Sequence, residues 1–406
     1  MKNKTVCIIG LGYIGLPTAA LLANRHYQVH GVDVVQKTVD TINQGKIHIV
    51  EPELDTFVRS AVNSGNLKAS ITPAKANVFI LAVPTPFHHN DDPSACPAPN
   101  IDYVISAARS IAPYVREGNI VILESTSPVG TTDKVAEILA ECGIDTTRVH
   151  IAHCPERVLP GHIMRELVEN DRIVGGITPE ATKVAADFYR TFVSGEVLET
   201  DAKTAEMAKL TENSFRDVNI AFANELSILC DKFGIDVWNL IRLANRHPRV
   251  NILQPGAGVG GHCIAVDPWF IVHKGGEDAK IIRAAREVNN YKTEWVIKKI
   301  KDSAANFEAA HGRKAKVACM GLAFKPDIDD LRESPALYIA QRLLADGIDI
   351  LAVEPNIDSH KDFPIIDTAV AVDEADIVVF LVKHKVFKYL SITDKEVLDF
   401  CSVTIH

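Results

Sequence analysis

The sequence predicts an α/β protein with two parallel-sheet domains joined by a long central helical region. Short apolar runs alternate with helix-forming segments at both ends of the chain, whereas apolar residues in the middle recur at helical spacing. The chain has 406 residues, which exceeds the size at which a single hydrophobic core keeps growing. Two or three domains are therefore expected.

The composition indicates a soluble globular protein and argues against a nucleic-acid partner. Hydrophobic residues make up 47% of the chain and charged residues 23%, enough apolar mass for sizeable cores. The formal net charge of −9 gives no overall attraction to a polyphosphate backbone. A local basic pocket for a phosphate-bearing small molecule remains compatible with this charge.

The cysteines and the apolar runs predict a cytoplasmic protein that does not enter a membrane. The eight cysteines form no CxxC pair, as is typical of reduced intracellular thiols, and no metal site is expected. The apolar stretch at the N-terminus is short and broken by glycines, so it is interpreted as a strand. The longest strongly apolar run, Ile377 to Val382, is far too short to cross a bilayer.

Strands and helices alternate in the first part of the chain, expected to form one domain over residues 1–199. Thr5 to Ile9 and Gln28 to Asp33 are predicted strands flanking a helix. Val78 to Val83 and Ile120 to Leu123 are predicted as further strands, each ending in polar or Pro/Gly-rich residues. This rhythm is typical of a parallel sheet with ligand loops at the strand ends.

The middle of the chain, residues 200–310, is predicted to be helical. One long helix is expected from Ala202 to Phe233, because apolar residues recur at spacings of three and four. Asp236 is expected to cap a shorter helix that ends at Ala244, and a glycine-rich loop follows as far as Cys263. A second long helix is expected from Asp278 to about Phe307.

The α/β rhythm returns in residues 311–406, the third expected domain. Predicted strands are Val317 to Gly321, Ile348 to Val353 and Ile377 to Val382, and Ser334-Pro335 is the expected start of a helix. VACMGLAFKP echoes VCIIGLGYIGLP near the start but lacks its second and third glycines. The chain ends at Ser402 to His406, apparently inside a strand.

The first chemical motif is a dinucleotide fingerprint, which predicts a Rossmann-like first domain. The echo in VACMGLAFKP predicts a second Rossmann-like sheet that no longer binds a dinucleotide in the same way. G-x-G-x-x-G lies between a strand and a helix, and Asp33 follows at the end of the next strand. The Asp33 side chain would accept hydrogen bonds from ribose hydroxyls and repel a 2′-phosphate, favouring NAD over NADP. Thr85 and Thr126 end later strands and are either cofactor contacts or turn residues. The expected NAD contacts in the turn are Gly10, Gly12, Tyr13, Ile14 and Gly15.

The second motif is a thiol in a glycine loop. Four of the six residues from Gly256 to Gly261, just ahead of Cys263, are glycines, so the backbone there can approach a ligand closely. Cys263 is either a nucleophile or an inert thiol. Lys209, Asn213 and Arg216 share one face of the long helix, opposite its apolar stripe, which is either an ordinary solvated face or part of a site. Lysine lowers the pKa of a neighbouring thiol, and Asn and Lys donors stabilise an oxyanion.

These motifs together resemble the nucleotide-sugar 6-dehydrogenase family, the UDP-glucose/GDP-mannose 6-dehydrogenases. The match runs in order from about residue 5 to about residue 382. It is carried by GLGYIGLP, VPTP, ESTSPVG, CPERVLPG, EMAKLTENSFRDVNIAFANE, LANRHPRVNILQPGAGVGGHCIAVDPWF and GLAFKPDIDDLRESPA.

The resemblance implies an NAD-dependent four-electron oxidation of a UDP-sugar. Cys263 would form a thiohemiacetal and then a thioester, which water hydrolyses. Lys209 is the implied acid/base, Asn213 would hold an oxygen or the water, and Glu156 is a candidate general base. Asp267 would orient the lysine or the water, or serve as the N-cap of the helix that follows.

UDP-N-acetyl-D-mannosamine is the expected substrate, and its uronate the product. The alternatives are UDP-N-acetylglucosamine, UDP-glucose, or a catalytically weak NAD-binding dimer. The resemblance also implies a homodimer through the central helices and places Arg332 near the cofactor. The implied substrate contacts are Arg157, Val158, Lys209, Asn213, Arg216, His247, Arg249, Gly260 and Lys325.

One departure from the family concerns the end of the chain. Members generally continue past the last strand into an Asp-x-Lys/Arg-Gly segment whose basic residue helps to bind the nucleotide sugar. This chain ends where that segment would begin, so the third domain, which is expected to bind the UDP-sugar, is expected either to be truncated or to diverge from the family in its last stretch.

Overall fold

The computed structural model describes residues 4–88, 96–261 and 263–404, which divide into two compact units. The first unit spans residues 1–211 and the second residues 212–406. Helix α8 (Ala202–Phe233) is continuous across the boundary between them. None of the helices in the described part of the chain is long and apolar enough to cross a membrane.

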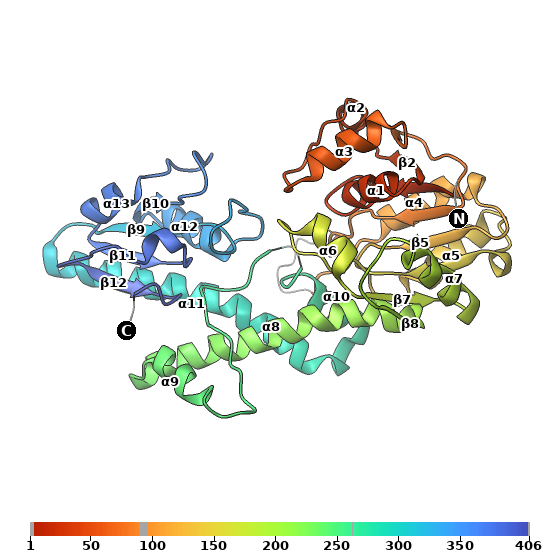
Figure 1. The fold of residues 1–406 in the computed structure, drawn as a ribbon. Coiled ribbons are helices and arrows are strands. Elements are labelled where there is room, and N and C mark those ends of the chain that lie inside the picture. The colour runs from red at the N-terminus through yellow and green to blue at the C-terminus, as the bar shows by residue number, and fades with distance from the viewer. Residues whose placement is uncertain (1–3, 89–95, 262, 405–406) are drawn as a thin grey trace. The chain divides into compact units, whose positions relative to one another are not determined.

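The first unit is built on an eight-stranded, mostly parallel sheet (Figure 1). Its strand order is β3-β2-β1-β4-β5-β6-β7-β8, and β7 runs antiparallel to β6. The strands are β1 (Thr5–Ile9), β2 (Gln28–Val32), β3 (Leu67–Ser70), β4 (Val78–Leu81), β5 (Ile120–Leu123), β6 (His150–His153), β7 (Arg172–Gly176) and β8 (Val197–Asp201). All four strands predicted here are confirmed, although β2 and β4 end one or two residues earlier.

Helices cover both faces of this sheet because its strands are apolar on both sides. Val6 and Ile8 pack into one core with α1, α3, α6 and α7, whereas Cys7 and Ile9 pack into the other with α4 and α5. Such two-sided burial is the physical basis of a parallel sheet. The helices are α1 (Gly15–Asn24), α2 (Gln36–Asn43), α3 (Leu54–Asn63), α4 (Asp102–Ile111), α5 (Thr131–Glu141), α6 (Ile163–Glu169) and α7 (Pro179–Tyr189).

The second unit contains the predicted second sheet, with four parallel strands in the order β10-β9-β11-β12. α11 and α12 cover one face of the sheet and α13 packs on the other. The strands are β9 (Lys316–Met320), β10 (Asp349–Val353), β11 (Ile377–Phe380) and β12 (Glu396–Asp399). The helices are α9 (Val237–Ala244), α10 (Asp267–Gly275), α11 (Lys280–His311), α12 (Pro335–Ala345) and α13 (Thr368–Glu374). The predicted fold class is confirmed.

The side chains of the N-cap residues stabilise the starts of α9, α12 and α13. Asp236 accepts from the Trp238 amide at the start of α9, and Ser334 accepts from Leu337 at the start of α12.

The final segment of the chain was wrongly predicted to be a strand. The last strand, β12, ends at Asp399, whose carboxylate accepts from Cys401 and Thr404 amides and turns the chain out of the sheet. Ile405 and His406 lie outside the described residues.

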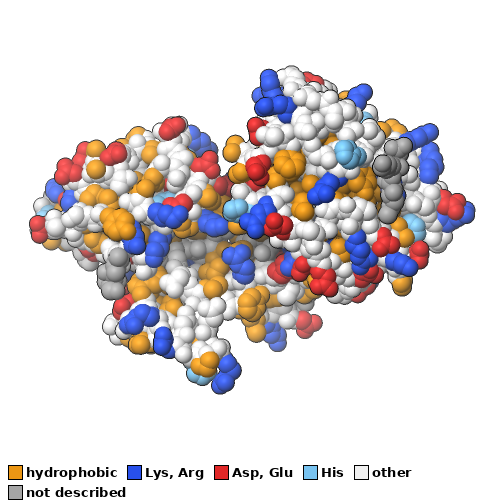
Figure 2. Space-filling view, viewed as in Figure 1, with side chains coloured by type: hydrophobic (Ala, Val, Ile, Leu, Met, Phe, Trp, Pro, Cys, Tyr) orange, Lys and Arg blue, Asp and Glu red, His pale blue; other side chains and the backbone are white. Residues whose placement is uncertain are grey.

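Helix α8 begins and ends at the predicted residues, but its burial is the reverse of an ordinary amphipathic helix. The apolar stripe is exposed, with Phe215 68% and Phe222 55% accessible. The opposite face is polar and buried against α11, where Arg286 pairs with Asp217 at 2.7 Å. Apolar side chains also appear on the surface around α9 (Figure 2). A stripe of exposed phenylalanines is typical of an interaction surface.

Candidate functional site

The turn after β1 has the geometry that a dinucleotide pyrophosphate needs. Gly10 has φ +91°, and its amide donates to the Val32 carbonyl at 2.8 Å. A Cβ on Gly15 would lie 1.8 Å from the Gly10 carbonyl oxygen, so α1 packs on the turn only because position 15 is glycine. Apart from its two chain neighbours, no atom of the described residues lies within 4 Å of a Cβ built on Gly12. This leaves space beside the α1 N-terminus for a phosphate.

Asp33 lies next to this turn, as expected from the fingerprint. Its Oδ2 accepts from the Leu11 amide at 3.1 Å and its Oδ1 from the Val35 amide at 3.0 Å. The half-buried carboxylate therefore also closes the turn. Ile14 is the residue before α1, and Tyr13 is 39% exposed at the same place. The position of the carboxylate fits the ribose end of NAD.

Thr85 and Thr126, predicted as separate candidates, lie in contact. Thr85 Oγ1 donates to the Thr126 carbonyl at 2.6 Å, and Ser125 Oγ donates to the Val83 carbonyl at 2.6 Å. These bonds join the segments that follow β4 and β5 at the same edge of the sheet as Gly10. The order of the strands reverses between β1 and β4, and ligands bind beside such a reversal in open α/β sheets.

The CPER segment after β6 is fixed by buried charges. Glu156 Oε2 pairs with Arg172 Nη1 at 2.5 Å, and Glu156 Oε1 accepts from the Arg157 amide. Arg157 Nη1 reaches the Asp171 carbonyl, and Val158 packs at the edge of the core. The candidate base is thus held in an ion pair, which the sequence analysis did not foresee because Arg172 lies on another strand.

Glu51 also holds the CPERVLPG segment, and it was not among the residues predicted from the sequence. It is buried, and its carboxylate accepts from the Gly161 and Ile163 amides at 2.8 Å each. The CPERVLPG segment is thereby tied to the chain before α3, about 110 residues away in sequence. No local pattern distinguishes this glutamate from its neighbour Glu53, so only the tertiary contact identifies it.

Burial, the largest cause, and the nearby negative charge of Glu156 together raise the pKa of Glu124 to about 7. Between its ordinary value of 4.5 and about 7, the folded chain keeps a proton that the unfolded chain has lost. Stability therefore falls as the pH rises through this window. Glu124→Gln stays neutral and keeps an acceptor for the Tyr189 hydroxyl, which now donates at 2.7 Å.

We expect Glu124→Gln to raise the free energy of unfolding by about 1–3 kcal/mol above the upper end of this window. Little change is expected near pH 4.5. Urea unfolding of both chains at the two pH values measures the difference. Equal stabilisation at both values would contradict a buried, titrating Glu124.

The glycines before Cys263 allow close packing on another loop of the same unit. A Cβ on Gly260 would lie 2.3 Å from the Glu333 carbonyl oxygen and 2.7 Å from Pro335 Cδ. Gly261 has φ +84°, and its Cβ would meet the Phe324 ring. The expected close approach is therefore made at least in part to protein, and Gly260 contacts the segment that leads into α12.

Cys263 lies in the turn that leads into α10. Its side chain is exposed, and its carbonyl accepts from the Val266 and Asp267 amides at 3.1 and 2.8 Å. A thiol close to a helix N-terminus lies in the electropositive environment that favours a thiolate. The exposed thiol and its position fit a nucleophile.

The alternative interpretation of Asp267, as the N-cap of α10, was wrong. The cap is Val266, and Asp267 is the first helical residue. Its buried Oδ2 accepts from Asn213 Nδ2 of α8 at 2.5 Å, so two predicted catalytic residues are in direct contact. Asp267, which lies four residues after Cys263 in the chain, thereby orients the side-chain amide of Asn213.

The predicted basic residues are mostly exposed. Lys209 is half-buried, one turn before Asn213 on α8, whereas Arg216, His247, Arg249 and Lys325 are exposed. Arg332 Nη2 is paired with Asp330 Oδ2 at 2.6 Å. The turn around Gly12 belongs to the first unit, and the Cys263 loop belongs to the second.

The glycine turn and its acid define a dinucleotide-binding fold of the dehydrogenase class. Sequence comparison then gives the family, because three of its profiles match this chain. They are the NAD binding domain over residues 4–193, the central domain over 203–291 and the UDP binding domain over 318–403. The chain belongs to the UDP-glucose/GDP-mannose dehydrogenase family. NAD binding and dehydrogenase activity, both predicted from the sequence, are confirmed at this level.

Individual relatives are similar over nearly their whole length. A UDP-N-acetyl-D-mannosamine dehydrogenase of Campylobacter jejuni is 55% identical, over 98% of this chain and 99% of the relative. An NDP-N-acetyl-D-galactosaminuronic acid dehydrogenase of Ralstonia nicotianae is 52% identical, over 97% and 93%. The solved UDP-N-acetyl-mannosamine dehydrogenase Cap5O of S. aureus is 43% identical with a TM-score of 0.84, over 99% of this chain and 95% of that one.

Proposed function

We propose that this chain oxidises UDP-N-acetyl-D-mannosamine to the corresponding uronate, reducing two NAD⁺ and consuming one water. The observation that carries the proposal is the 55% identity, over almost the full length of both chains, to the Campylobacter jejuni enzyme. The exposed Cys263 beside the Asn213–Asp267 pair supplies the residues that such a reaction needs.

The proposed chemistry is divided between the cysteine and the polar residues of α8 and α10. When bound, NAD⁺ accepts a hydride in each of the two oxidations. Cys263 Sγ adds to the C6 aldehyde to form a thiohemiacetal, and the second oxidation leaves a thioester that water cleaves to the carboxylate and free thiol. Lys209 transfers the proton of the C6 oxygen. Asn213, oriented by Asp267, donates to that oxygen or to the water, and Glu156 is the candidate base for the water.

We propose the following binding residues and division of the chain. NAD lies against Gly10, Gly12, Tyr13, Ile14, Gly15, Asp33, Thr85, Thr126 and Arg332. The UDP-sugar contacts Arg157, Val158, Lys209, Asn213, Arg216, His247, Arg249, Gly260 and Lys325. Residues 1–199 hold the cofactor, 200–310 carry the cysteine loop and the dimer helices, and 311–406 hold the nucleotide. The cytoplasmic location stays a prediction.

Replacement of Asn213 by alanine is expected to lower kcat by roughly a hundredfold, because it removes a buried donor from the reacting oxygen or water. Asn219→Ala is the matched control. Asn219 lies on the same helix but donates to the Phe215 carbonyl instead of to Asp267. Steady-state NADH production by the three proteins checks this. Equal rates for Asn213→Ala and the control would remove Asn213 from the mechanism.

We also propose that the exposed stripe of α8 forms a homodimer. Phe215, Phe222 and Phe233 are each more than half exposed on one side of the helix, which is costly for a lone chain in water. Phe222→Glu is expected to yield monomers, because it buries a charge in the interface. Light scattering after size-exclusion chromatography checks the mass. A native monomer, or an unchanged dimer for Phe222→Glu, would contradict the proposal.

A panel of nucleotide sugars tests the substrate. We expect the highest kcat/KM with UDP-N-acetyl-D-mannosamine, and lower values with UDP-N-acetylglucosamine and UDP-glucose. UDP-N-acetylgalactosamine is the second candidate because of the 52% identical Ralstonia relative. A preference for UDP-glucose would contradict the proposed recognition of an acetamido sugar. Absence of turnover with every sugar, despite NAD binding, would favour a catalytically weak NAD-binding dimer.

A further inference from the structure

The two sheets of this chain contain the same turn, each followed by an acid at the end of the neighbouring strand. Gly10 and Gly321 have φ +91° and +89°, and their amides donate to the last residues of β2 and β10, both at 2.8 Å. Leu322 N donates to Glu354 Oε2 at 2.8 Å, as Leu11 N does to Asp33. Glu354 thus occupies in the second sheet the place that the NAD-ribose acid occupies in the first.

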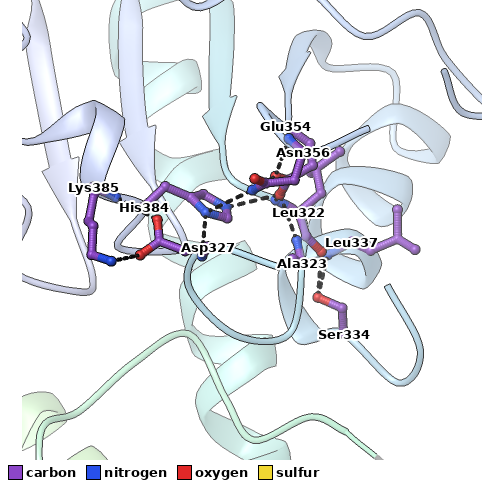
Figure 3. Close-up of polar contacts among 9 residues, drawn as sticks. All are labelled: Leu322, Ala323, Asp327, Ser334, Leu337, Glu354, Asn356, His384 and Lys385. Carbon is purple, nitrogen blue, oxygen red and sulfur yellow. Dashed lines mark hydrogen bonds and ion pairs between the residues drawn. The ribbon is translucent and has the colours of Figure 1, made fainter. Parts of the chain in front are cut away.

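Unlike Asp33, Glu354 is turned fully into the protein. Its side chain is only 1% exposed, and both of its oxygens are used (Figure 3). Oε2 accepts from the Leu322 and Ala323 amides and from the ring of His384, whereas Oε1 accepts from the amide and side chain of Asn356. Although burial raises it, the hydrogen bonds from His384 and the two amides bring the pKa of Glu354 down to about 2. A ribose hydroxyl has no access to this carboxylate.

His384 bridges Glu354 to the far side of the Gly321–Ser334 loop. Its Nδ1 lies 2.9 Å from the Asp327 amide, which can only donate, so Nδ1 accepts. Nε2 therefore carries the proton and donates to Glu354 at 3.0 Å. Asp327 has φ +61°, a conformation that a non-glycine residue adopts at a cost, and the His384 bond helps to hold it there.

The loop is thereby fixed at three points. Glu354 holds its beginning, His384 holds Asp327 in its middle, and Ser334 closes its end by donating to the Leu322 carbonyl at 2.6 Å (Figure 3). Lys385 adds a backbone bond to the Asp327 carboxylate at 2.9 Å. Side chains on the surface of the loop, including Lys325, are exposed, whereas its backbone amides are bound by the buried Glu354 and His384.

The same loop supports the glycine loop that carries Cys263. Glu333 and Pro335 contact Gly260, and the Phe324 ring contacts Gly261, two residues before the cysteine. A Cβ added to Gly260 or Gly261 would lie closer to these atoms than ordinary van der Waals contact, so no space is left between the two loops. The two loops therefore cannot shift independently. A change at Glu354 or His384 would therefore reach both Lys325 and Cys263.

We propose that Glu354 and His384 are positioning residues that hold the Gly321–Ser334 loop for the UDP-sugar and for the Cys263 loop. The inference rests on the proposed function, in which Lys325 meets the diphosphate. In the first sheet the corresponding acid, Asp33, contacts the cofactor. In the second sheet Glu354 and His384 are buried and fix the loop that contacts the substrate.

Two conservative substitutions of His384 separate positioning from mere burial. Asn can place an acceptor where Nδ1 lies, whereas Gln reaches the position of Nε2 and leaves the Asp327 amide without its acceptor. For His384→Gln we expect the KM for UDP-N-acetyl-D-mannosamine to rise about tenfold, and the KM for NAD⁺, which meets this loop only through Arg332, to rise less. His384→Asn should recover most of the loss. His360→Gln is the control, because His360 bonds to Asp362 of the same unit instead of the loop.

Asp327→Gly provides a second test in case the buried variants do not fold. Asp327 lies at the surface, and glycine accepts its positive φ, so folding should be kept while both Lys385 contacts are lost. The KM for the UDP-sugar should again rise selectively. A native KM for folded His384→Gln would overturn the positioning role of His384, and a native KM for Asp327→Gly would overturn the contribution of the Lys385 contacts to holding the loop. A native chain that oxidises no nucleotide sugar would instead refute the proposed function itself.

Discussion

Cys263→Ser is expected to lower the steady-state rate of uronate formation by roughly a thousandfold. A serine oxygen forms its hemiacetal and ester less readily than a thiolate, and the oxygen ester is hydrolysed more slowly than a thioester. The second oxidation or the hydrolysis should therefore stall after the first turnover. Rapid mixing with UDP-N-acetyl-D-mannosamine and NAD⁺, followed by intact-mass measurement, distinguishes these two stalled states.

Cys142→Ser is the control for this substitution, because Cys142 is also exposed but lies just after α5 in the first unit. It should retain the native rate. Uronate formation by Cys263→Ser at an unchanged rate would exclude a covalent intermediate on this thiol and leave its exposed position before α10 without a catalytic explanation.

Substitutions in the glycine turn should separate NAD binding from folding. Gly12→Ala adds a methyl group that, apart from its chain neighbours, meets no atom of the described residues within 4 Å, so we expect the unfolding temperature to stay native. The same methyl group occupies the space open to the pyrophosphate, and the dissociation constant for NAD⁺ should rise about tenfold or more. Calorimetric titration with NAD⁺ and thermal unfolding measure the two effects.

Gly15→Ala is the contrasting variant. Its Cβ would lie 1.8 Å from the Gly10 carbonyl oxygen, so α1 must move away from the turn. We expect a loss of about 3 kcal/mol or more in unfolding free energy, together with loss of NAD binding. Native NAD affinity in Gly12→Ala, or native stability in Gly15→Ala, would contradict the roles assigned to these two glycines.

The parts of the fold that local patterns determine were predicted well. The apolar periodicity of α8 predicted both of its ends, and Asp236 and Ser334 were recognised as caps because capping depends on residues two or three positions apart. The fingerprint glycines were likewise predicted in the turn between β1 and α1, because their spacing is a local feature of the sequence.

Tertiary partners were beyond the reach of these patterns. The Asn213–Asp267 bond joins residues 54 positions apart, and the Glu354–His384 pair joins residues 30 apart. The exposure of the α8 stripe was also unforeseen, because periodicity identifies an apolar face without showing what covers it. The glycines before Cys263 were interpreted as space for a ligand, whereas their nearest neighbours include Phe324 and Glu333.

We propose that one active site carries out both oxidations through a thioester on Cys263. The most direct test is to count the NADH formed for each UDP-N-acetyl-D-mannosamine consumed by the native chain, with the uronate identified by mass. We expect two NADH per sugar, with no free aldehyde. A ratio of one, with aldehyde released into solution, would contradict it.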